Sequence, residues 1–235
     1  MIPTTWNTQT YQEYIKYLES LKDQNYKDFQ GKLIFTKYKM LGIRIPKLRS
    51  IAKQISKTNI SSFLEITQNK YYEEVMVNGF VVASIKDENL FDEYFIQHIK
   101  FIDDWSLCDS FCNSIKQVRN NKDKYFKIAI ELSLSKGEFI SRVGLIIILS
   151  HFLEETYLKE IFKVLNNIKT DKYYVNMAEA WLICELYIKY PKETTKFLIK
   201  NKLNKFTQNK SINKIRESYR ISKEEKDYLN TLKRK

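Results

Sequence analysis

A tryptophan and an aspartate stand four residues apart in the segment DDWSLCDSFC, residues 103–112, as Trp105 and Asp109. On a helix this spacing places both side chains on one face, one turn apart. The Asp109 carboxylate then lies among apolar neighbours and beside an indole, an arrangement suited to stabilising a cationic sugar intermediate. The alternative is a structural role, in which Asp109 binds the backbone of a neighbouring helix.

Two further residues interrupt apolar helical patterns. Arg142 directly precedes the apolar run of residues 143–149, so its guanidinium borders a core and requires an anionic partner. That partner is either an internal carboxylate, with Asp109 as a candidate, or a phosphate of DNA. Trp181 lies on an otherwise aliphatic helical pattern. It is either a core residue or an indole platform for DNA at the rim of a basic groove.

Positive charge is concentrated at the end of the chain. The formal net charge is +12, and residues 189–235 hold 15 Lys and Arg against five Asp and Glu. A general abundance of lysine explains this clustering less well than a polyanionic partner does. Within this segment the candidates for contact with DNA phosphates are Lys210, Lys214, Arg216 and Arg220.

Other kinds of site find little support. Cys108 and Cys112 resemble half of a metal site, but no Cys or His with ligand spacing completes it, so we expect no metal. The odd number of cysteines and the lack of a secretory signal favour a reducing cytoplasm. The longest apolar run, residues 144–153, is interrupted by His151 and is too short to span a bilayer. Neither a P-loop, a dinucleotide fingerprint, HExxH nor a nucleophile elbow occurs, and we expect no cofactor.

The elements that position these residues are predicted to be helices. Five glycines and three prolines are few for a β-rich chain, and apolar residues recur at helical spacing nearly throughout. About a dozen helices, paired by short polar connectors, have roughly the period of HEAT-like hairpins. We therefore predict an all-α fold, an α-solenoid of HEAT-like helical hairpin repeats with a concave basic face. It forms one domain over residues 1–235, with an N-terminal helical cap (1–25) and strongly basic C-terminal helices (189–235).

Several helix starts can be predicted from capping residues. Pro46 is placed to open a helix at its first turn. Asp103 or Asp104 can cap the helix that carries Trp105, and Asp171 can cap the one that carries Trp181. Near the end of the chain, residues 222–225 have capping-box spacing.

Taken in order, six segments resemble the DNA alkylation repair family of AlkD-type glycosylases, from about Tyr26 onward. They are MLGIRIPKLRSIAKQI (40–55), EEVMVNGFVVASIK (73–86), DDWSLCDSFC (103–112), SRVGLIIIL (141–149) with Arg142, YYVNMAEAWLICELYIKYP (173–191) with Trp181, and INKIRESYRISKEEKDYL (212–229). The resemblance implies a HEAT-like solenoid whose concave face holds duplex DNA. It also implies excision of N3- and N7-alkylated purines without a deep base-flipping pocket.

By the same resemblance, Asp109 is the catalytic carboxylate, Trp105 and Trp181 contact the deoxyribose of the damaged nucleotide, and Arg142 holds a backbone phosphate. A departing cationic purine leaves an oxocarbenium-like sugar, which a fixed carboxylate and two indoles stabilise. The leaving group needs no proton, so one carboxylate suffices. We expect a monomer in the bacterial cytoplasm, associated with the nucleoid through DNA.

Two other functions remain open at this stage. One is a non-catalytic protein that binds damaged or branched DNA with the same scaffold. The other is a HEAT-type protein-interaction scaffold whose grooves bind peptide. Excision of a methylated base is expected of a glycosylase and not of the non-catalytic DNA-binding protein. A steep salt dependence of DNA binding is expected of both DNA-binding proteins and not of the peptide-binding scaffold.

Overall fold

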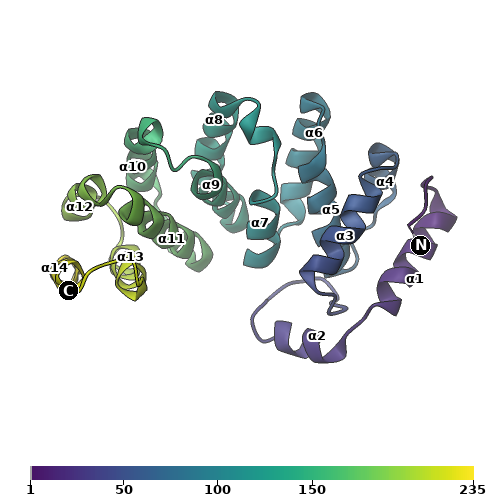
Figure 1. Cartoon of the computed structure of the whole chain (residues 1–235), viewed down its shortest axis with the longest axis horizontal. Coiled ribbons are helices and arrows are strands. Elements are labelled where there is room, and N and C mark those ends of the chain that lie inside the picture. Colours follow the sequence, from purple (N-terminus) through teal and green to yellow (C-terminus); the bar gives the residue numbers. More distant parts are fainter. Residues whose placement is uncertain (1) are drawn as a thin grey trace. The chain divides into compact units, whose positions relative to one another are not determined.

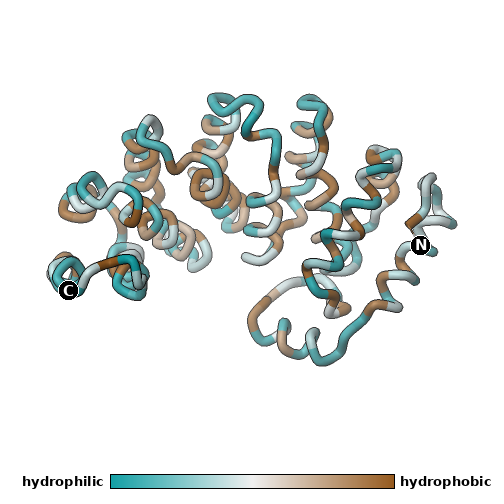
Figure 2. Tube along the Cα trace, in the orientation of Figure 1, coloured by the Kyte–Doolittle hydropathy of each residue, from teal (hydrophilic) through white to brown (hydrophobic). Residues whose placement is uncertain are grey.

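The computed structural model describes residues 2–235, and this part of the chain is all-helical, as predicted (Figure 1). It contains fourteen α-helices and three short 3₁₀ helices. No β-strand occurs among the described residues, and one isolated bridge pairs Lys39 with Tyr71. Hydrophobic and hydrophilic residues alternate along most helices (Figure 2), as expected where one face of each helix is buried.

The chain divides into two compact units, Met1–Asn120 and Asn121–Lys235. Buried apolar side chains occur along both. The expectation of one domain over residues 1–235 stays a prediction. The helices of the first unit are α1 (Thr8–Ser20), α2 (Gln24–Gln30), α3 (Ile45–Ile55), α4 (Ile60–Ile66), α5 (Tyr72–Ser84), α6 (Glu88–His98), η1 (Ile99–Phe101), α7 (Trp105–Cys112) and η2 (Gln117–Arg119).

In the first unit α5 is the central element, because α3, α6 and α7 all pack against it. Every residue of α5 from Tyr72 to Ala83 is buried, and only its last residue, Ser84, is partly exposed. Two adjacent carboxylates at its start are buried as well, and both are fully occupied by hydrogen bonds. Glu73 accepts from the backbone N–H groups of residues 41–43, and Glu74 accepts from those of Gln68 and Lys70. These bonds hold two segments, the one that precedes α3 and the one that precedes α5, against the first turn of α5.

The turn at Gly42 depends on the absence of a side chain. Its φ of +86° lies in the left-handed region, and an added Cβ would lie 2.3 Å from the carbonyl oxygen of Asp23. Three residues later α3 begins, with Pro46 in its first turn as predicted.

The second unit contains α8 (Lys122–Ser133), α9 (Glu138–His151), η3 (Glu155–Tyr157), α10 (Leu158–Asn167), α11 (Tyr173–Lys189), α12 (Pro191–Ile199), α13 (Lys205–Glu217) and α14 (Lys223–Thr231). Here α11 is the central helix and packs against α9, α12 and α13, while α8 packs on α9. Its seventeen residues include ten that are buried.

Three of the predicted helix starts are confirmed and one is wrong. Asp104 caps α7, and Ser222 forms the predicted capping box with Glu225. Asp171 does not cap α11, which begins at Tyr173 after Lys172 and has no side-chain cap. The reason is tertiary: the Oε1 atom of Glu138, on α9, accepts the N–H of Tyr174 at 2.9 Å and replaces a local cap.

The cysteines and the apolar helices were considered from the sequence as possible metal ligands or disulfides and as possible membrane spans. All three cysteines, Cys108, Cys112 and Cys184, are buried, and none forms a disulfide. Within residues 2–235, no helix combines the length and apolar character needed to cross a membrane.

Candidate functional site

The structure places Trp105 and Asp109 on α7, at the first and fifth positions of the helix. Both side chains are half-buried, whereas the three residues between them, Ser106, Leu107 and Cys108, are buried. The predicted i, i+4 arrangement is therefore present: an indole and a carboxylate share one partly exposed face, one helical turn apart.

The indole of Trp105 is held by a hydrogen bond to the loop between α2 and α3. Its Nε1–H donates to the carbonyl oxygen of Leu33, and the N–O distance is 3.1 Å. The same loop binds the residue pair ahead of α7, because Asp103 accepts from Thr36 Oγ1 and from the N–H of Lys37, both at 2.8 Å. The orientation of the indole thus depends on a segment about 70 residues earlier in the chain, which sequence periodicity could not indicate.

The start of α7 is fixed by Asp104. Its buried carboxylate accepts the N–H groups of Ser106 and Leu107 and the hydroxyl of Tyr72. Burial raises the pKa of Asp104 to about 7, with Asp103 adding to the increase and the two backbone donors opposing it. The cap that positions Trp105 and Asp109 therefore titrates close to neutral pH.

Arg142 lies on α9 and is buried, with 5% of its surface exposed. Its Nη1 donates to the carbonyl oxygen of Tyr174 at 2.8 Å, which ties α9 to the first turn of α11. The sequence predicted that this guanidinium would border a core, and its burial agrees with that. The predicted partner was an anion, whereas the Tyr174 oxygen is a neutral carbonyl. A contact with DNA phosphate stays a prediction.

Trp181 is half-buried on α11, seven residues and therefore about two turns beyond Tyr174. Within the second unit, Arg142 therefore contacts α11, and Trp181 lies on that same helix. Trp105 and Asp109 belong to the first unit.

The basic residues predicted to bind DNA lie on or just after α13. Lys210, Lys214 and Arg216 are half-buried on α13, and Arg220 is exposed and paired with Glu185, with an N–O distance of 3.6 Å. Both Lys214 and Arg220 act electrostatically on Cys184, one turn beyond Trp181, where they partly offset the increase of its pKa to about 11 that burial causes. These two cations therefore lie close to the part of α11 that follows Trp181.

Sequence reasoning missed one titratable group in this region. Glu179, two residues before Trp181, is buried, and burial raises its pKa to about 8 against the opposing effects of Lys169 and Thr207. Its position between Ala178 and Ala180 in an apolar helix was the available signal. For metal ions, residues 2–235 contain no group of three or more His, Cys, Asp or Glu side chains arranged to hold one.

These features define a class: an all-helical protein with a carboxylate and an indole on one helix face and a basic C-terminal segment suited to a polyanion. The family described as DNA alkylation repair enzyme matches residues 14–215, so the chain belongs to this family. Membership supports an enzymatic role in DNA repair with DNA as the substrate. No curated protein and no solved structure matched the sequence.

Proposed function

We propose that this protein is a DNA glycosylase that hydrolyses the N-glycosidic bond of N3- and N7-alkylated purines in duplex DNA. The observation that carries the proposal is the pair on α7: in a chain of the DNA alkylation repair enzyme family, Asp109 and Trp105 share a partly exposed helix face. A carboxylate beside an indole suits a reaction in which positive charge develops on a sugar.

In the proposed reaction the bond between C1′ and the purine nitrogen breaks, and its electron pair neutralises the cationic base. Asp109 stabilises the oxocarbenium-like sugar and orients the attacking water, which bonds to C1′ through its oxygen, releases one proton to solvent and leaves a hydroxyl on C1′. Trp105 and Trp181 contact the deoxyribose and add cation–π stabilisation, about 0.5–2 kcal/mol each. Because the alkylated base leaves as a neutral molecule, no general acid is required.

We further propose that the helical pairs stack as HEAT-like repeats with a concave basic face for duplex DNA. In support, consecutive odd-numbered helices pack on one another within each unit: α3, α5 and α7 in the first, and α9, α11 and α13 in the second. Arg142, Lys210, Lys214, Arg216 and Arg220 would hold backbone phosphates, and the lesion would not enter a deep pocket. Acting on chromosomal DNA, the protein would work as a monomer in the bacterial cytoplasm.

Release of free 7-methylguanine and 3-methyladenine from methylated duplex DNA tests this function. We expect the wild-type protein to release both bases, and Asp109→Asn to lower the single-turnover rate by at least about a hundredfold, the effect of losing one group that stabilises the transition state. Binding to undamaged duplex should be largely retained, since Asn keeps the size of the side chain.

Asp123→Asn, an exposed aspartate in the first turn of α8, is the matched control and should excise at the wild-type rate. Excision by Asp109→Asn at the rate of this control would show that Asp109 is not the catalytic carboxylate. Tight binding of branched or nicked DNA with no released base would instead assign the protein to the non-catalytic class.

A further inference from the structure

Four aromatic side chains form a continuous row across three helices of the second unit. Phe139 of α9 contacts Tyr174 of α11 with ring centroids 5.2 Å apart, Tyr174 contacts Tyr173 at 5.3 Å, and Tyr173 contacts Phe206 of α13 at 6.0 Å. We call these four residues the aromatic row. Its first two members are half-buried, but Tyr173 and Phe206 are 56% and 44% exposed. Large exposed aromatic surfaces that adjoin one another are characteristic of binding sites.

The exposed end of the row is held in place by Asn204. This residue caps α13 by accepting the N–H of Thr207 at 2.7 Å. Its Nδ2 also donates to the carbonyl oxygen of Thr170 and to Oδ1 of Asn176, at 3.1 and 3.2 Å. The start of α13, which carries Phe206, is therefore tied to the loop before α11 and to α11 itself, which carries Tyr173.

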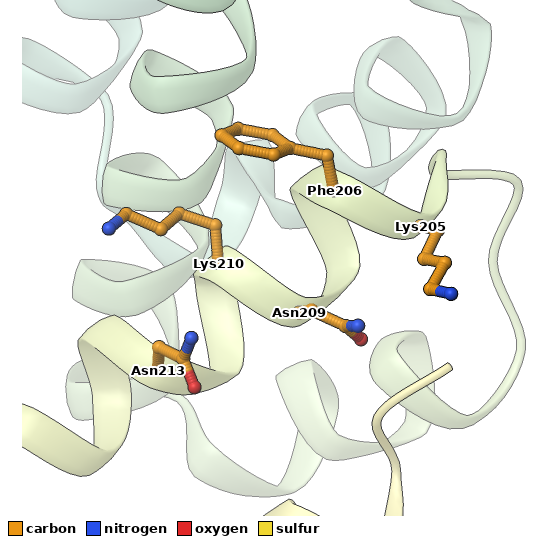
Figure 3. A pocket seen from close by; sticks show the side chains of 5 residues that line it. All are labelled: Lys205, Phe206, Asn209, Lys210 and Asn213. Carbon is orange, nitrogen blue, oxygen red and sulfur yellow. The ribbon is translucent and has the colours of Figure 1, made fainter. Parts of the chain in front are cut away.

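Two open hollows meet at Phe206. One, of about 490 Å³, is lined by Lys205, Phe206, Asn209, Lys210 and Asn213, which Figure 3 shows along α13 with Phe206 and Lys210 directed to the same side. The other, of about 500 Å³, lies between Phe206 and Tyr173 and includes Asn176, Asn204 and Asp171. The described lining of the first hollow contains two lysines, two amides and no carboxylate.

We infer that the exposed end of the aromatic row binds unpaired nucleotides, with a base stacked on Tyr173 or Phe206 and the adjacent phosphates beside Lys205 and Lys210. Stacking on aromatic side chains beside lysines is how proteins hold single strands without reading their sequence. The two rings are inclined by 56°, so a base stacks on one ring and meets the other with its edge. Asn209 and Asn213 also line the first hollow and supply amides that polar base edges can bind.

The occupant is a nucleic acid rather than an apolar peptide because cations flank the rings. Residues 189–235 carry 15 Lys and Arg against five Asp and Glu, and the exposed end of the row lies where α13 of this segment meets α11. Paired bases present only their edges, so ring-on-base stacking selects unpaired nucleotides. The inference deepens the proposed function, on which it rests: the DNA substrate would include gaps, flaps or frayed ends as well as continuous duplex.

Binding of a fluorescein-labelled 20-nucleotide oligothymidylate, of the same strand in a duplex, and of a gapped duplex tests this inference by anisotropy at fixed salt. The variants Tyr173→Leu and Phe206→Leu keep apolar bulk but remove the ring. We expect each to weaken oligothymidylate binding by about tenfold, in line with the loss of one stacked base. Binding to continuous duplex should change less than twofold, and gapped duplex should lie between the two.

The matched control is Tyr219→Leu, because Tyr219 is fully exposed in the same unit and lies outside the row. Phe206→Trp keeps an aromatic face and should retain or improve binding. Equal oligothymidylate affinity for wild type, Tyr173→Leu and Phe206→Leu would overturn the inference, and so would a wild-type protein that does not bind the single strand. Thermal melting of each variant verifies that the fold is intact.

Failure of this inference can be distinguished from failure of the proposed function. If the wild-type protein excises methylated purines but the ring variants bind oligothymidylate normally, the row has no such role and the glycosylase proposal stands. If no base is released from methylated DNA but the ring variants lose single-strand affinity, the row is a nucleic-acid site and the glycosylase proposal fails.

Discussion

At the scale of single residues, Trp105 combines a polar and an aromatic contribution that substitution can separate. Its N–H bonds to Leu33, and its aromatic ring shares one face of α7 with Asp109, one helical turn away. Trp105→Phe keeps an aromatic face without the hydrogen bond, a loss of about 0.5–1.5 kcal/mol. Trp105→Leu also removes the cation–π contribution, about 0.5–2 kcal/mol. We therefore expect single-turnover excision rates in the order wild type, Phe, Leu, with several-fold steps.

Trp6 supplies the control for this series. Its Nε1–H donates to Thr58 Oγ1 at 2.8 Å, and its ring packs on Phe63 with centroids 4.7 Å apart. Trp6→Phe should lower the melting temperature and leave the excision rate of the folded protein unchanged. Equal rates for Trp105→Phe and Trp105→Leu would mean that the aromatic face makes no contribution to the reaction.

Glu179 gives a prediction about stability and pH. Because burial raises its pKa to about 8, the folded protein keeps a proton on this group that the unfolded chain releases from about pH 4.5 upward. The free energy of unfolding should therefore fall as pH rises through this window, by at most about 1.4 kcal/mol per pH unit. Glu179→Gln removes this slope, so we expect it to be more stable than wild type at pH 8–9, with the difference shrinking toward pH 5.

Urea unfolding at intervals from pH 5 to pH 9 measures the effect. Glu131→Gln, an exposed residue of α8, should follow the wild-type curve throughout. A difference between Glu179→Gln and wild type that does not depend on pH would show that the carboxyl does not titrate with the expected shift.

At the scale of helices and loops, the positions of most helices could be predicted from the sequence. The long-range hydrogen bonds that hold them together could not. Apolar periodicity and capping residues locate helices because both act over three or four residues. The bonds that fix the site are long-range: Leu33 to Trp105, and Glu138 to Tyr174 in place of the predicted Asp171 cap. Such partners depend on which loops meet after folding, so the spacing of Trp105 and Asp109 could be predicted but not what orients them.

The packing of α8 on α9 depends on the absence of a side chain at Gly144. An added Cβ would lie 2.4 Å from the carbonyl oxygen of Ala129 and 2.4 Å from the N atom of Ser133, both backbone atoms of α8. Neither can move without displacing its helix. We expect Gly144→Ala to lower the free energy of unfolding by about 1–3 kcal/mol, as overpacking does, and to reduce excision because Arg142 lies two residues away.

Gly137→Ala is the matched control, at the start of the same helix. There the nearest atom to the added Cβ is Cγ1 of Ile140 at 3.2 Å, part of a flexible side chain. Urea unfolding should place this variant within about 0.5 kcal/mol of wild type. A Gly144→Ala protein as stable as Gly137→Ala would contradict the close approach of α8 and α9.

At the scale of the whole molecule, charge and the proposed chemistry are divided between the two units. Residues 1–120 hold 16 Lys and Arg against 14 Asp and Glu, whereas residues 121–235 hold 24 against 14. The first unit carries Asp109 and Trp105 and has little net charge. The second carries Trp181, the predicted phosphate contacts and nearly all of the excess positive charge. The proposed function thus draws on residues of both units.

A double-mutant cycle on Trp105 and Trp181 tests whether the two indoles act on one nucleotide, as the proposed function requires. If both indoles stabilise the same developing sugar cation, losing one weakens what the other can contribute, and the two effects on the single-turnover rate are not additive. We expect a coupling energy of at least about 0.5 kcal/mol for Trp105→Leu with Trp181→Leu. Trp105→Leu combined with Tyr219→Leu, which alters an exposed ring elsewhere in the second unit, should show none. Strict additivity of the two tryptophans, measured at saturating protein, would mean that they act on different parts of the DNA.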